Sequence, residues 1–328
     1  MSLKIIKAGV LDTIQDTGRF GYQSSGINPG GAMDRFSAQL ANCLLGKQMD
    51  APVIEMHFPA PTIEFEEATI ICITGADFDP VINQASIPKN QPIAVNKNAV
   101  LEFKKAKTGA RCYLSILQSL TLQKWLNSYS TNLKVEAGGY KGRTLKVGDV
   151  IKFRKEDAIC NYLQSCNFRV LPFKVELFGG TSTNCVEVIK GNEWDWLTAE
   201  SQHLFTTKPF TISTLADRMG YRLHGEVLEL REQKQLVSSA VSFGTLQLLP
   251  TGQLIVLMAD HQTTGGYPRV GHVISAHLPR LAQMKPHNSI SFKIVDIETA
   301  EQQIVQQYHY LLSVQQASEF KIEKVLQC

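Results

Sequence analysis

A stretch of sixteen residues that occurs twice constrains the fold of this chain more than any other feature. The first copy, TIEFEEATIICITGAD, runs from Thr62 to Asp77, and the second, TLQLLPTGQLIVLMAD, runs from Thr245 to Asp260. The two copies align without a gap and both end in Ala-Asp. A repeat of this length, one copy in each half, indicates an internal duplication.

Two shorter pairs occur in the same order along the chain. RFGYQSSG, residues 19–26, resembles RMGYRLHG, residues 218–225, and NAVLEFK resembles NSISFKI. Arg19 and Arg218 therefore occupy equivalent positions in the proposed repeat. We predict two related domains, residues 1–165 and residues 166–328, the second ending in a helix.

Most apolar runs in the chain alternate with a period of two and are bounded by Gly, Pro, Asn and Asp, a pattern typical of short strands. Helical spacing is confined to three segments, residues 31–46, residues 275–284 with Ser275 as N-cap, and residues 298–314. A chain of many short strands protects its sheet edges best by closing them. The predicted fold class is mainly β, with two related β-barrel domains and a few short helices.

The composition excludes several classes of function. The chain has 328 residues, 19% of them charged, and a net charge of +3. Its basic clusters, EFKKAK and KFRK, follow strand-like runs and indicate solvated strand edges rather than a nucleic-acid site. No apolar run is long enough to cross a membrane, so neither nucleic acid nor a membrane is an expected partner.

The seven cysteines form no CxxC pair or metal-binding pattern. Cys43, Cys72 and Cys112 lie in apolar segments and are expected in the core. Cys160 and Cys166 are close enough in sequence to pair, but the chain is interpreted as reduced and cytoplasmic. We expect no metal site, because His272 and His277 do not have the spacing of zinc ligands on a helix.

The strongest candidate site is the segment ADHQTTGGYP, which follows the second Ala-Asp strand. Its glycines, Gly265 and Gly266, permit unusual backbone angles and leave amides exposed to a ligand. Thr263 and Thr264 add hydroxyl groups, and Asp260 adds an acceptor that orients or deprotonates a substrate. A plain hairpin loop explains the same residues equally well.

Other candidate residues lie at strand and helix ends. Gly30 and Gly31 precede a helix, where exposed amides bind anions. Either Arg19 or Arg218 can bind a carboxylate, although an internal ion pair with the nearby Asp16 or Asp217 is the stronger expectation. The remaining candidate substrate contacts are Asp34, Asp77, Tyr221 and Tyr267.

These segments, together with ITGAD and GGYKGRTLKVGD, resemble in composition and order the allophanate hydrolase subunit 2 family. This family is also called the biotin-dependent carboxyltransferase or Kip-type A family, and the resemblance spans nearly the whole chain. It implies cyclophilin-like β-barrel domains and a smaller sister protein with a related barrel.

The resemblance implies one of three functions. Free-standing members are mostly the C subunit of bacterial 5-oxoprolinase, which opens 5-oxo-L-proline to L-glutamate at the expense of ATP, beside an A subunit and a Kip-type I protein as the B subunit. Members fused into urea carboxylase transfer a carboxyl group from carboxybiotin to urea; here biotin would come from another chain. A third branch regulates a Kip-type kinase inhibitor without catalysis.

We expect the oxoprolinase function, with a small cyclic amide as substrate. Arg218 or Arg19 would hold the substrate carboxylate, and Asp260 would handle a proton or orient the substrate. The amides of Gly265 and Gly266 would stabilise developing negative charge. The ATP site is not visible in this chain.

One segment departs from the family pattern. Where members read approximately GGIDVPxVLGSRST, this chain reads QSLTLQKWLNSYST, with Gln118 and Ser119 in place of the glycine pair and Asn127 and Tyr129 in place of the later Gly and Arg. If that Arg contacts an anionic substrate, the change removes a charge and favours the regulatory alternative.

Overall fold

The structure is a computed structural model that describes residues 2–153, 163, 166–175, 184–232 and 234–327. It divides into two compact units. Unit 1 comprises Met1–Gly18, Asp34–Phe178 and Tyr308–Cys328, and unit 2 comprises Arg19–Met33 and Gly179–Gln307. The predicted boundary between residues 165 and 166 adjoins residues outside the described ranges and stays a prediction.

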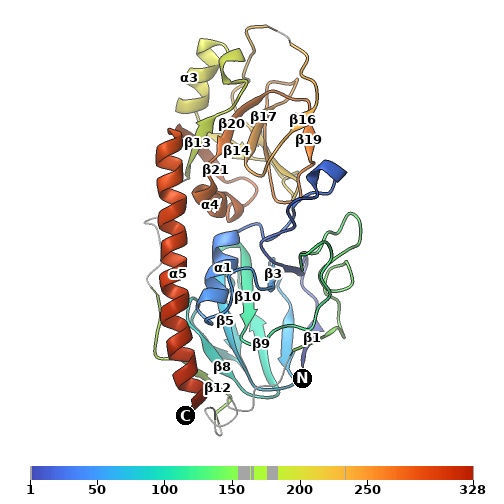
Figure 1. Cartoon of the computed structure of the whole chain (residues 1–328), viewed down its shortest axis with the longest axis vertical. Coiled ribbons are helices and arrows are strands. Elements are labelled where there is room, and N and C mark those ends of the chain that lie inside the picture. Colours follow the sequence, from blue (N-terminus) through green and yellow to red (C-terminus); the bar gives the residue numbers. More distant parts are fainter. Residues whose placement is uncertain (1, 154–162, 164–165, 176–183, 233, 328) are drawn as a thin grey trace. The chain divides into compact units, whose positions relative to one another are not determined.

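Unit 1 contains two antiparallel sheets of six strands each (Figure 1). The first sheet has the order β11 (Val150–Lys152), β1 (Ser2–Lys7), β4 (Thr62–Phe65), β9 (Ala99–Phe103), β6 (Pro80–Ile82) and β7 (Ala85–Ser86). The second has the order β12 (Phe168–Val170), β8 (Ile93–Val95), β5 (Thr69–Asp77), β10 (Thr108–Ile116), β3 (Val53–Met56) and β2 (Thr13–Gln15). The short strands and frequent turns predicted from the sequence therefore form sheets.

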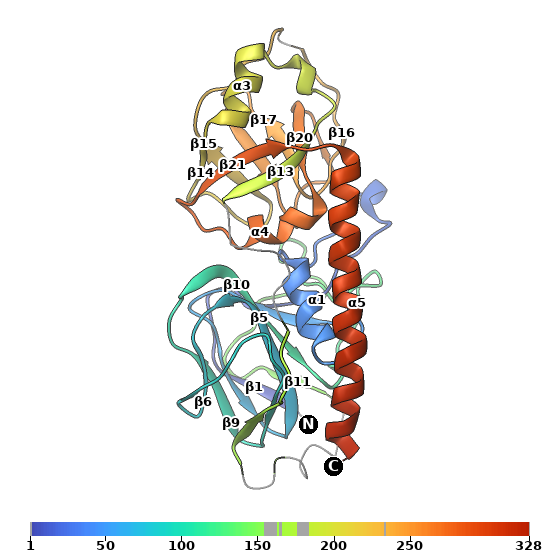
Figure 2. The same cartoon turned by 90° about the vertical axis from the view of Figure 1, so that its left-hand side faces the viewer.

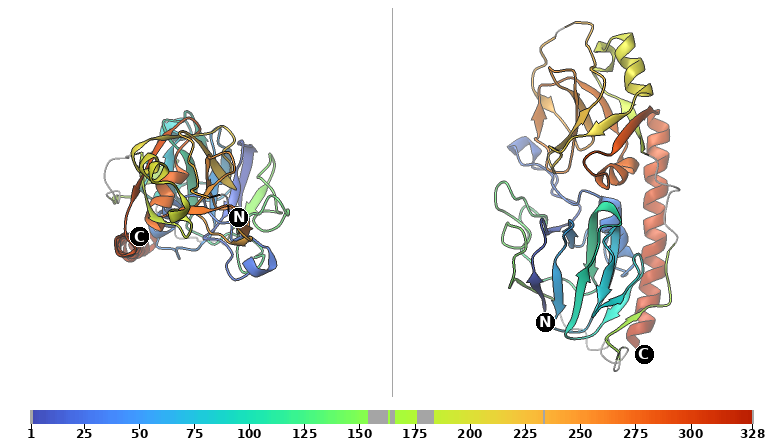
Figure 3. Two further views of the ribbon diagram at one scale, coloured as in Figure 1. Left: turned by 90° about the horizontal axis from the view of Figure 1, so that it is seen from above. Right: turned by 180° about the vertical axis from the view of Figure 1, so that it is seen from behind.

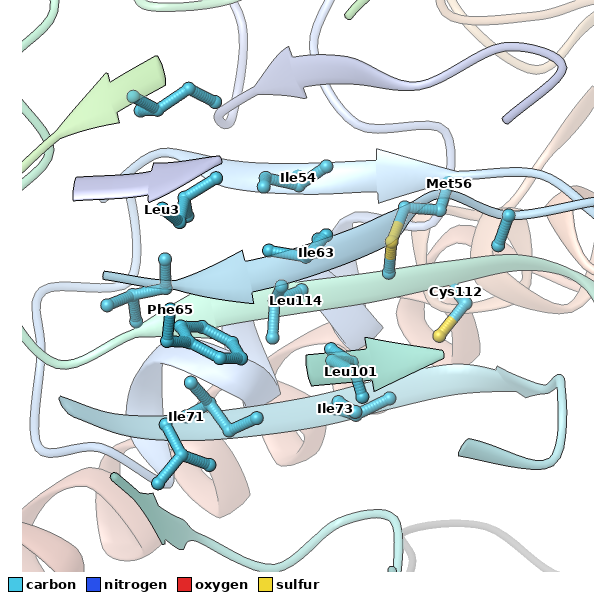
Figure 4. Close-up of a cluster of buried hydrophobic side chains, with 14 of the residues drawn as sticks. Leu3, Ile54, Met56, Ile63, Phe65, Ile71, Ile73, Leu101, Cys112 and Leu114 are labelled. Carbon is cyan, nitrogen blue, oxygen red and sulfur yellow. The ribbon is translucent and has the colours of Figure 1, made fainter. Parts of the chain in front are cut away.

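The core of unit 1 lies between these sheets, and both contribute side chains to it (Figure 4). Ile63 and Leu101 come from the first sheet, and Ile73 and Leu114 come from the second; none is more than 1% exposed. Because successive side chains of a strand point to opposite faces, the period-two pattern places these residues on one face of each sheet. Each fully buried Leu or Ile stabilises the fold by about 2 kcal/mol.

Helices cover the outer face of the second sheet. Helix α1 (Arg35–Cys43) packs on β5 and β10, and its N-cap Asp34 accepts from the Ser37 N–H at 2.8 Å. The middle of α5 (Ile297–Gln327) lies beside α1 in Figures 1 and 2. Leu311 of α5 and Leu40 of α1 belong to one apolar cluster. The C-terminal helix is thus confirmed and is longer than its predicted seventeen residues, at 31 residues.

Unit 2 is a closed barrel of seven strands in the order β13-β20-β17-β18-β15-β14-β21. The bounds are β13 (Cys185–Lys190), β20 (Arg269–Val273), β17 (Thr245–Leu248), β18 (Leu254–Leu257), β15 (Gly220–His224), β14 (Phe210–Ile212) and β21 (Ser289–Ile294). Helix α3 (Ala199–Thr207), yellow in Figure 3, packs on β21. The shorter helical elements are η1 (Gln23–Ser25), η2 (Trp194–Trp196), η3 (Ser275–His277) and α4 (Leu278–Ala282). The mainly β prediction is confirmed.

The paired sequence segments have different structural settings. β4 and β5 lie in different sheets, whereas β17 and β18 are neighbours in the barrel. The first R-x-G-Y segment forms a loop with η1, and the second leads into strand β15. Only the third pair, in β9 and β21, is a strand after a turn in both halves. The expected equivalence of Arg19 and Arg218 is therefore wrong.

Two smaller predictions have clear outcomes, and a third involves a residue outside the described ranges. Cys43, Cys72 and Cys112 are buried, as expected, while Cys160 lies outside the described residues. Ser275 is not an N-cap, because η3 begins there and the residue that precedes α4 is His277, without a side-chain cap. A 3-10 turn thus starts this helical segment before α4 begins.

Candidate functional site

The polar segment after β18 starts at one end of the barrel in unit 2. Strand β18 pairs with β15 as far as Leu257 opposite Gly220. Beyond that pair, the Asp260 N–H donates to the Arg218 carbonyl at 2.7 Å. This hydrogen bond extends the contact between the two chain segments past their last strand residues. It places Asp260 beside Arg218.

Asp260 and Arg218 form a two-point ion pair. The Arg218 Nε donates to Asp260 Oδ2 at 2.7 Å, and its Nη2 donates to Asp260 Oδ1 at 3.1 Å. The side chains are only 8% and 18% exposed, so water screens the attraction weakly. An ion pair of Arg218 was expected, but the expected partner was wrong: Asp217 instead accepts from the Met219 and Gly220 amides.

The segment Arg19–Met33 brings further residues to this pair, since it belongs to unit 2. Met33 is fully buried in the barrel core and anchors the segment. Arg218 Nη2 also donates to the Gly31 carbonyl at 2.7 Å. One guanidinium group therefore holds both Asp260 and a backbone carbonyl from a distant part of the sequence.

Gly30 lies close to two side chains of opposite charge. A Cβ built on Gly30 would stand 3.0 Å from Arg19 Nη1 and 3.5 Å from Asp260 Oδ1. Gly30 and Gly31 have φ angles of 62° and 95°, which favour glycine. Arg19 is only 1% exposed. Five predicted residues thus come together, namely Arg19, Gly30, Gly31, Arg218 and Asp260.

The glycines of the TTGG segment do not have the predicted backbone angles. Gly265 lies in β19 (Thr264–Gly265), which pairs with β16 (Ser239–Ala240), and neither Gly265 nor Gly266 has a left-handed φ. A Cβ on Gly265 would stand 2.5 Å from Nε2 of Gln247 in β17, so the glycine lets the Gln247 side chain approach the β16–β19 pair closely. The prediction of unusual backbone angles here is wrong.

The other predicted contacts of this segment lie in or next to β19. Thr264 is exposed, and Thr263 is half-buried, with its carbonyl accepting from the Val241 N–H at 3.2 Å. Tyr267 is 44% exposed. Their roles in substrate binding, and that of the Gly265 and Gly266 amides, stay predictions.

A buried polar layer lies beneath the β16–β19 pair, on the outer face of β17 and β20. Gln247 Nε2 donates to the Tyr267 carbonyl at 3.5 Å. Arg269 binds both oxygens of Glu193, with Nη2 to Oε1 at 2.8 Å and Nε to Oε2 at 2.9 Å. Burial would raise the pKa of Glu193, but the hydrogen bonds and charge of Arg269 outweigh it and hold that pKa below its usual value.

His272 belongs to the same layer. Its Nδ1 lies 3.2 Å from the Thr245 hydroxyl, and burial, followed by the charge of Arg269, lowers its pKa. Sequence reasoning missed Glu193, Arg269 and Thr245 as members of a polar layer. One signal was present: Thr245 and Gln247 alternate with the core residues Leu246 and Leu248 in β17.

Three predicted contacts lie elsewhere. Asp34 caps α1 in unit 1, and Asp77 ends β5, where its Oδ1 accepts from the Asp79 N–H at 2.9 Å. Tyr221 is 2% exposed in the apolar core of the barrel. The structure does not bring these side chains into the group formed by Arg218 and Asp260, and their roles stay predictions.

The segment that departs from the family pattern is held by Asp16 in unit 1. Asp16 accepts from the Ser128 hydroxyl at 2.8 Å and from the Tyr129 N–H at 2.6 Å. Ser130 also donates its hydroxyl to this carboxylate. The expected ion pair of Asp16 with Arg19 is replaced by these hydroxyl and amide donors.

Residues 25–294 match the family described as carboxyltransferase domain, subdomain A and B. The chain belongs to this family. The resemblance read from the sequence motifs is thereby confirmed. Among the residues that the structure describes, no group of three or more His, Cys, Asp or Glu side chains is arranged to hold a metal ion. None of the helices in the described ranges is both long enough and apolar enough to span a bilayer.

This carboxyltransferase-domain chain is similar to two bacterial proteins over nearly their full lengths. It is 34% identical to the 5-oxoprolinase C subunit of Haemophilus influenzae over 288 residues, which cover 88% of this chain and 89% of that protein. It is 34% identical to the 5-oxoprolinase C subunit of Escherichia coli over 298 residues, which cover 91% and 93%.

A solved structure supports the fold of this carboxyltransferase-domain chain. The crystal structure of the Kluyveromyces lactis urea carboxylase matches 97% of this chain and 29% of that chain, with a TM-score of 0.86 and 24% identity. At this identity the likeness shows a shared fold.

Proposed function

We propose that this chain is the C subunit of an ATP-dependent 5-oxoprolinase, which opens the lactam of 5-oxo-L-proline to L-glutamate together with sister A and B subunits. Two relatives that carry the name of the 5-oxoprolinase C subunit support this function at 34% identity over nearly their whole lengths. The group around the Arg218–Asp260 ion pair supports it independently through its chemistry.

The charges beside Gly30 suit a cyclic amide. A lactam ring holds its amide cis, so the C=O acceptor and the N–H donor lie on the same edge. Arg19 Nη1 and Asp260 Oδ1, which both lie close to Gly30, supply one donor and one acceptor of the kinds that this edge needs. This juxtaposition is the observation on which the proposal depends.

The ion pair favours an orienting role for Asp260 over proton transfer. Both carboxylate oxygens already accept hydrogen bonds from Arg218. A carboxylate held in this way accepts an N–H from a substrate in a fixed direction, which lowers the entropic cost of reaching the reactive geometry. Arg218 then acts as a positioning residue, and Arg19 is the better candidate for the substrate oxygen or carboxylate.

The residues around Arg218 and Asp260 do not suit the binding of a nucleoside triphosphate. The carboxylate of Asp260 would repel the phosphates, and the nearby glycines lead into no phosphate-binding loop with a lysine. We therefore assign ATP to the complex and assign no residue of this chain to it.

The decisive experiment measures ATP hydrolysis and glutamate formation by this chain mixed with its sister subunits, with and without 5-oxo-L-proline. The expected result is stimulation by the lactam. Asp260→Asn is expected to lower turnover about 100-fold, the usual effect of losing one preorganised polar contact in an active site. Asp217→Asn is the matched control, because Asp217 is adjacent in sequence to Arg218 but does not bind it, and it should retain activity.

A second candidate function is a carboxyltransferase that accepts a carboxyl group from carboxybiotin supplied by another chain. The description of the matched family favours it. The ureido ring of biotin also presents a cis amide, so it fits the same donor and acceptor. Activity that depends on a biotinylated partner would decide for this candidate. A complex that assembles but turns over neither substrate would favour the regulatory alternative.

A further inference from the structure

Three hydrogen-bonded side chains cross the outer face of the unit 2 barrel. The Ser242 hydroxyl lies 3.2 Å from Thr245 Oγ1, which lies 3.2 Å from His272 Nδ1. Thr245 and His272 are cross-strand partners in β17 and β20, so the sheet fixes the second contact. Ser242 is exposed, Thr245 is fully buried and His272 is half-buried.

The hydrogen-bond capacity of Thr245 permits two complete arrangements. Its Oγ1 always accepts from the Ser242 N–H at 3.1 Å, which leaves one lone pair and one O–H. In the first arrangement Ser242 Oγ donates to Thr245, and Thr245 donates to His272 Nδ1. In the second, His272 Nδ1–H donates to Thr245, and Thr245 donates to Ser242. Both use the full hydrogen-bond capacity of Thr245 Oγ1. Changing from the first to the second moves one proton from Ser242 to Thr245 and one from Thr245 to His272, and Ser242 must then take up a proton.

The outer end of this chain of hydrogen bonds adjoins the predicted substrate loop. Val241, which precedes Ser242, donates its N–H to the Thr263 carbonyl at 3.2 Å. His272 stands at the other end, near the Glu193–Arg269 pair of the polar layer. Two charged groups face it, Arg269 from β20 and Glu193 beside η2, while β17 contributes the neutral Thr245.

We propose that Ser242, Thr245 and His272 form a proton relay that serves the candidate site, with Ser242 as its entry. Its part in catalysis rests on the proposed lactam hydrolysis. Water attack on the amide carbon forms a C–O bond, moves the C=O π pair onto the carbonyl oxygen and breaks a water O–H bond. The released proton passes to Ser242 Oγ. The Ser242 proton moves to Thr245, and the Thr245 proton moves to His272 Nδ1. The resulting imidazolium gives up one proton to solvent.

The electrostatics of His272 agree with this task. Burial lowers its pKa below the usual 6.5, and the Arg269 charge adds to this effect, while the Glu193 charge opposes it. His272 is therefore neutral at pH 7 and able to accept a proton. As the pH falls through its lowered pKa, His272 becomes protonated and the relay can no longer accept.

The test uses Thr245→Val, which removes the hydroxyl, with Thr245→Ser as the matched control that restores it. In the assembled complex, Thr245→Val and His272→Gln should lower lactam turnover about 100-fold, the lower end of the usual contribution of proton transfer. Thr245→Ser should stay within about threefold of the original chain, because it keeps the hydroxyl that the relay requires. His272→Gln should also lose the fall in rate below pH 6.5. Normal rates and an unchanged pH profile in Thr245→Val would overturn the relay.

A second measurement separates failure of the relay from failure of the proposed function. Nitrogen-15 NMR of the full-length chain reports which imidazole nitrogen of His272 carries the proton, with no need for activity. The original chain and Thr245→Ser should populate both tautomers, whereas Thr245→Val should shift strongly to one. If the original chain shows one tautomer that Thr245→Val does not change, the relay is wrong even in an active complex. If the complex shows no lactam turnover but the tautomers respond as expected, the relay stands and the proposed function fails.

Discussion

The two units stabilise their buried acidic side chains in different ways. In unit 2, Asp260 and Glu193 each bind an arginine at two points, Arg218 and Arg269 respectively. In unit 1, Asp12 is held by backbone amides instead, and its Oδ2 accepts from the Gly9 N–H at 2.7 Å. Arg269 holds the pKa of Glu193 below its usual value, whereas an acid buried without a cation resists ionisation.

This contrast shows where the charged chemistry of the chain is concentrated. Asp149 in unit 1 does bind Arg143, but that arginine side chain is 28% exposed and nearer to solvent. The unit 2 arginines are 8% and 16% exposed, so their charges act through a less polar medium. Fixed, weakly screened charges are what a site needs to orient a polar substrate. The comparison is limited to these ion pairs, because unit 1 also buries Arg111 and Glu55 close to Tyr113.

The largest expected effect concerns Asp12, whose pKa burial raises to about 7, against the opposing amides of Gly9 and His57. Its folded pKa exceeds its unfolded value of 3.8. Stability is therefore greatest below pH 4, falls as the pH rises to 7, and stays lowered above that. Three pKa units correspond to about 4 kcal/mol. Asp12→Asn cannot ionise, so it should be more stable than the original chain by about this amount at pH 8.5.

Urea unfolding of both chains between pH 4 and pH 8.5 measures this difference. The gain should shrink toward zero near pH 4, where the original Asp12 is protonated in both states. Asp12 is 1% exposed, and its Oδ1 has no hydrogen-bond partner within the described ranges. Placing the amide nitrogen of Asn at the Oδ1 position therefore breaks no hydrogen bond or ion pair. A difference that does not depend on pH would show that Asp12 ionises freely, and the contrast between the units would be lost.

Glu193 should show the opposite pH dependence, with a smaller effect. Its folded pKa lies below the ordinary 4.5 because Arg269 outweighs the cost of burial. Its contribution is therefore present above the unfolded pKa and is lost as the pH falls through the folded pKa. Glu193→Gln should cost about 2 kcal/mol at pH 7, the usual value of hydrogen bonds to a charged group. The two chains should become equally stable under acid conditions. A constant cost at every pH would mean that packing, not charge, makes Glu193 important.

The sequence predicted the strands well because alternation along a strand depends only on local residues. Leu246 and Leu248 point into the barrel, and the residues between them point outward, as the period of two requires. It also located Asp260 correctly at a strand end, next to the apolar run that forms β18.

The partners of the site residues could not be predicted in the same way. Arg218 meets Asp260 across a strand pair, and Gly31 reaches Arg218 from 187 residues away. Such contacts depend on tertiary packing, which no periodicity encodes. The repeated R-x-G-Y motif did not indicate equivalent structures, because the same residue types form a loop in the first copy and lead into a strand in the second. The Gly265–Gly266 pair was misread because a glycine required for close packing looks the same in sequence as one required for its φ angle.

The smallest expected effect on stability comes from two glycines of the segment Arg19–Met33. Both have a left-handed backbone, but their surroundings differ, so comparing them tests the site. Gly30 has a φ of 62° and lies against Arg19 and Asp260, whereas Gly26 has a φ of 77° and nothing within 4 Å of its Cβ position. Changing either to Ala should cost about 1 kcal/mol through the backbone alone. Only Gly30→Ala also places a methyl group against Arg19 and Asp260, the two side chains proposed to bind the lactam. We therefore expect similar urea midpoints for the two variants but a rise in KM for 5-oxo-L-proline of about tenfold in Gly30→Ala alone, the effect of about 1.4 kcal/mol of lost binding. An equal KM in the two variants would contradict the proposed binding of the substrate beside Gly30. The Arg218–Asp260 pair would then have only a structural role in unit 2.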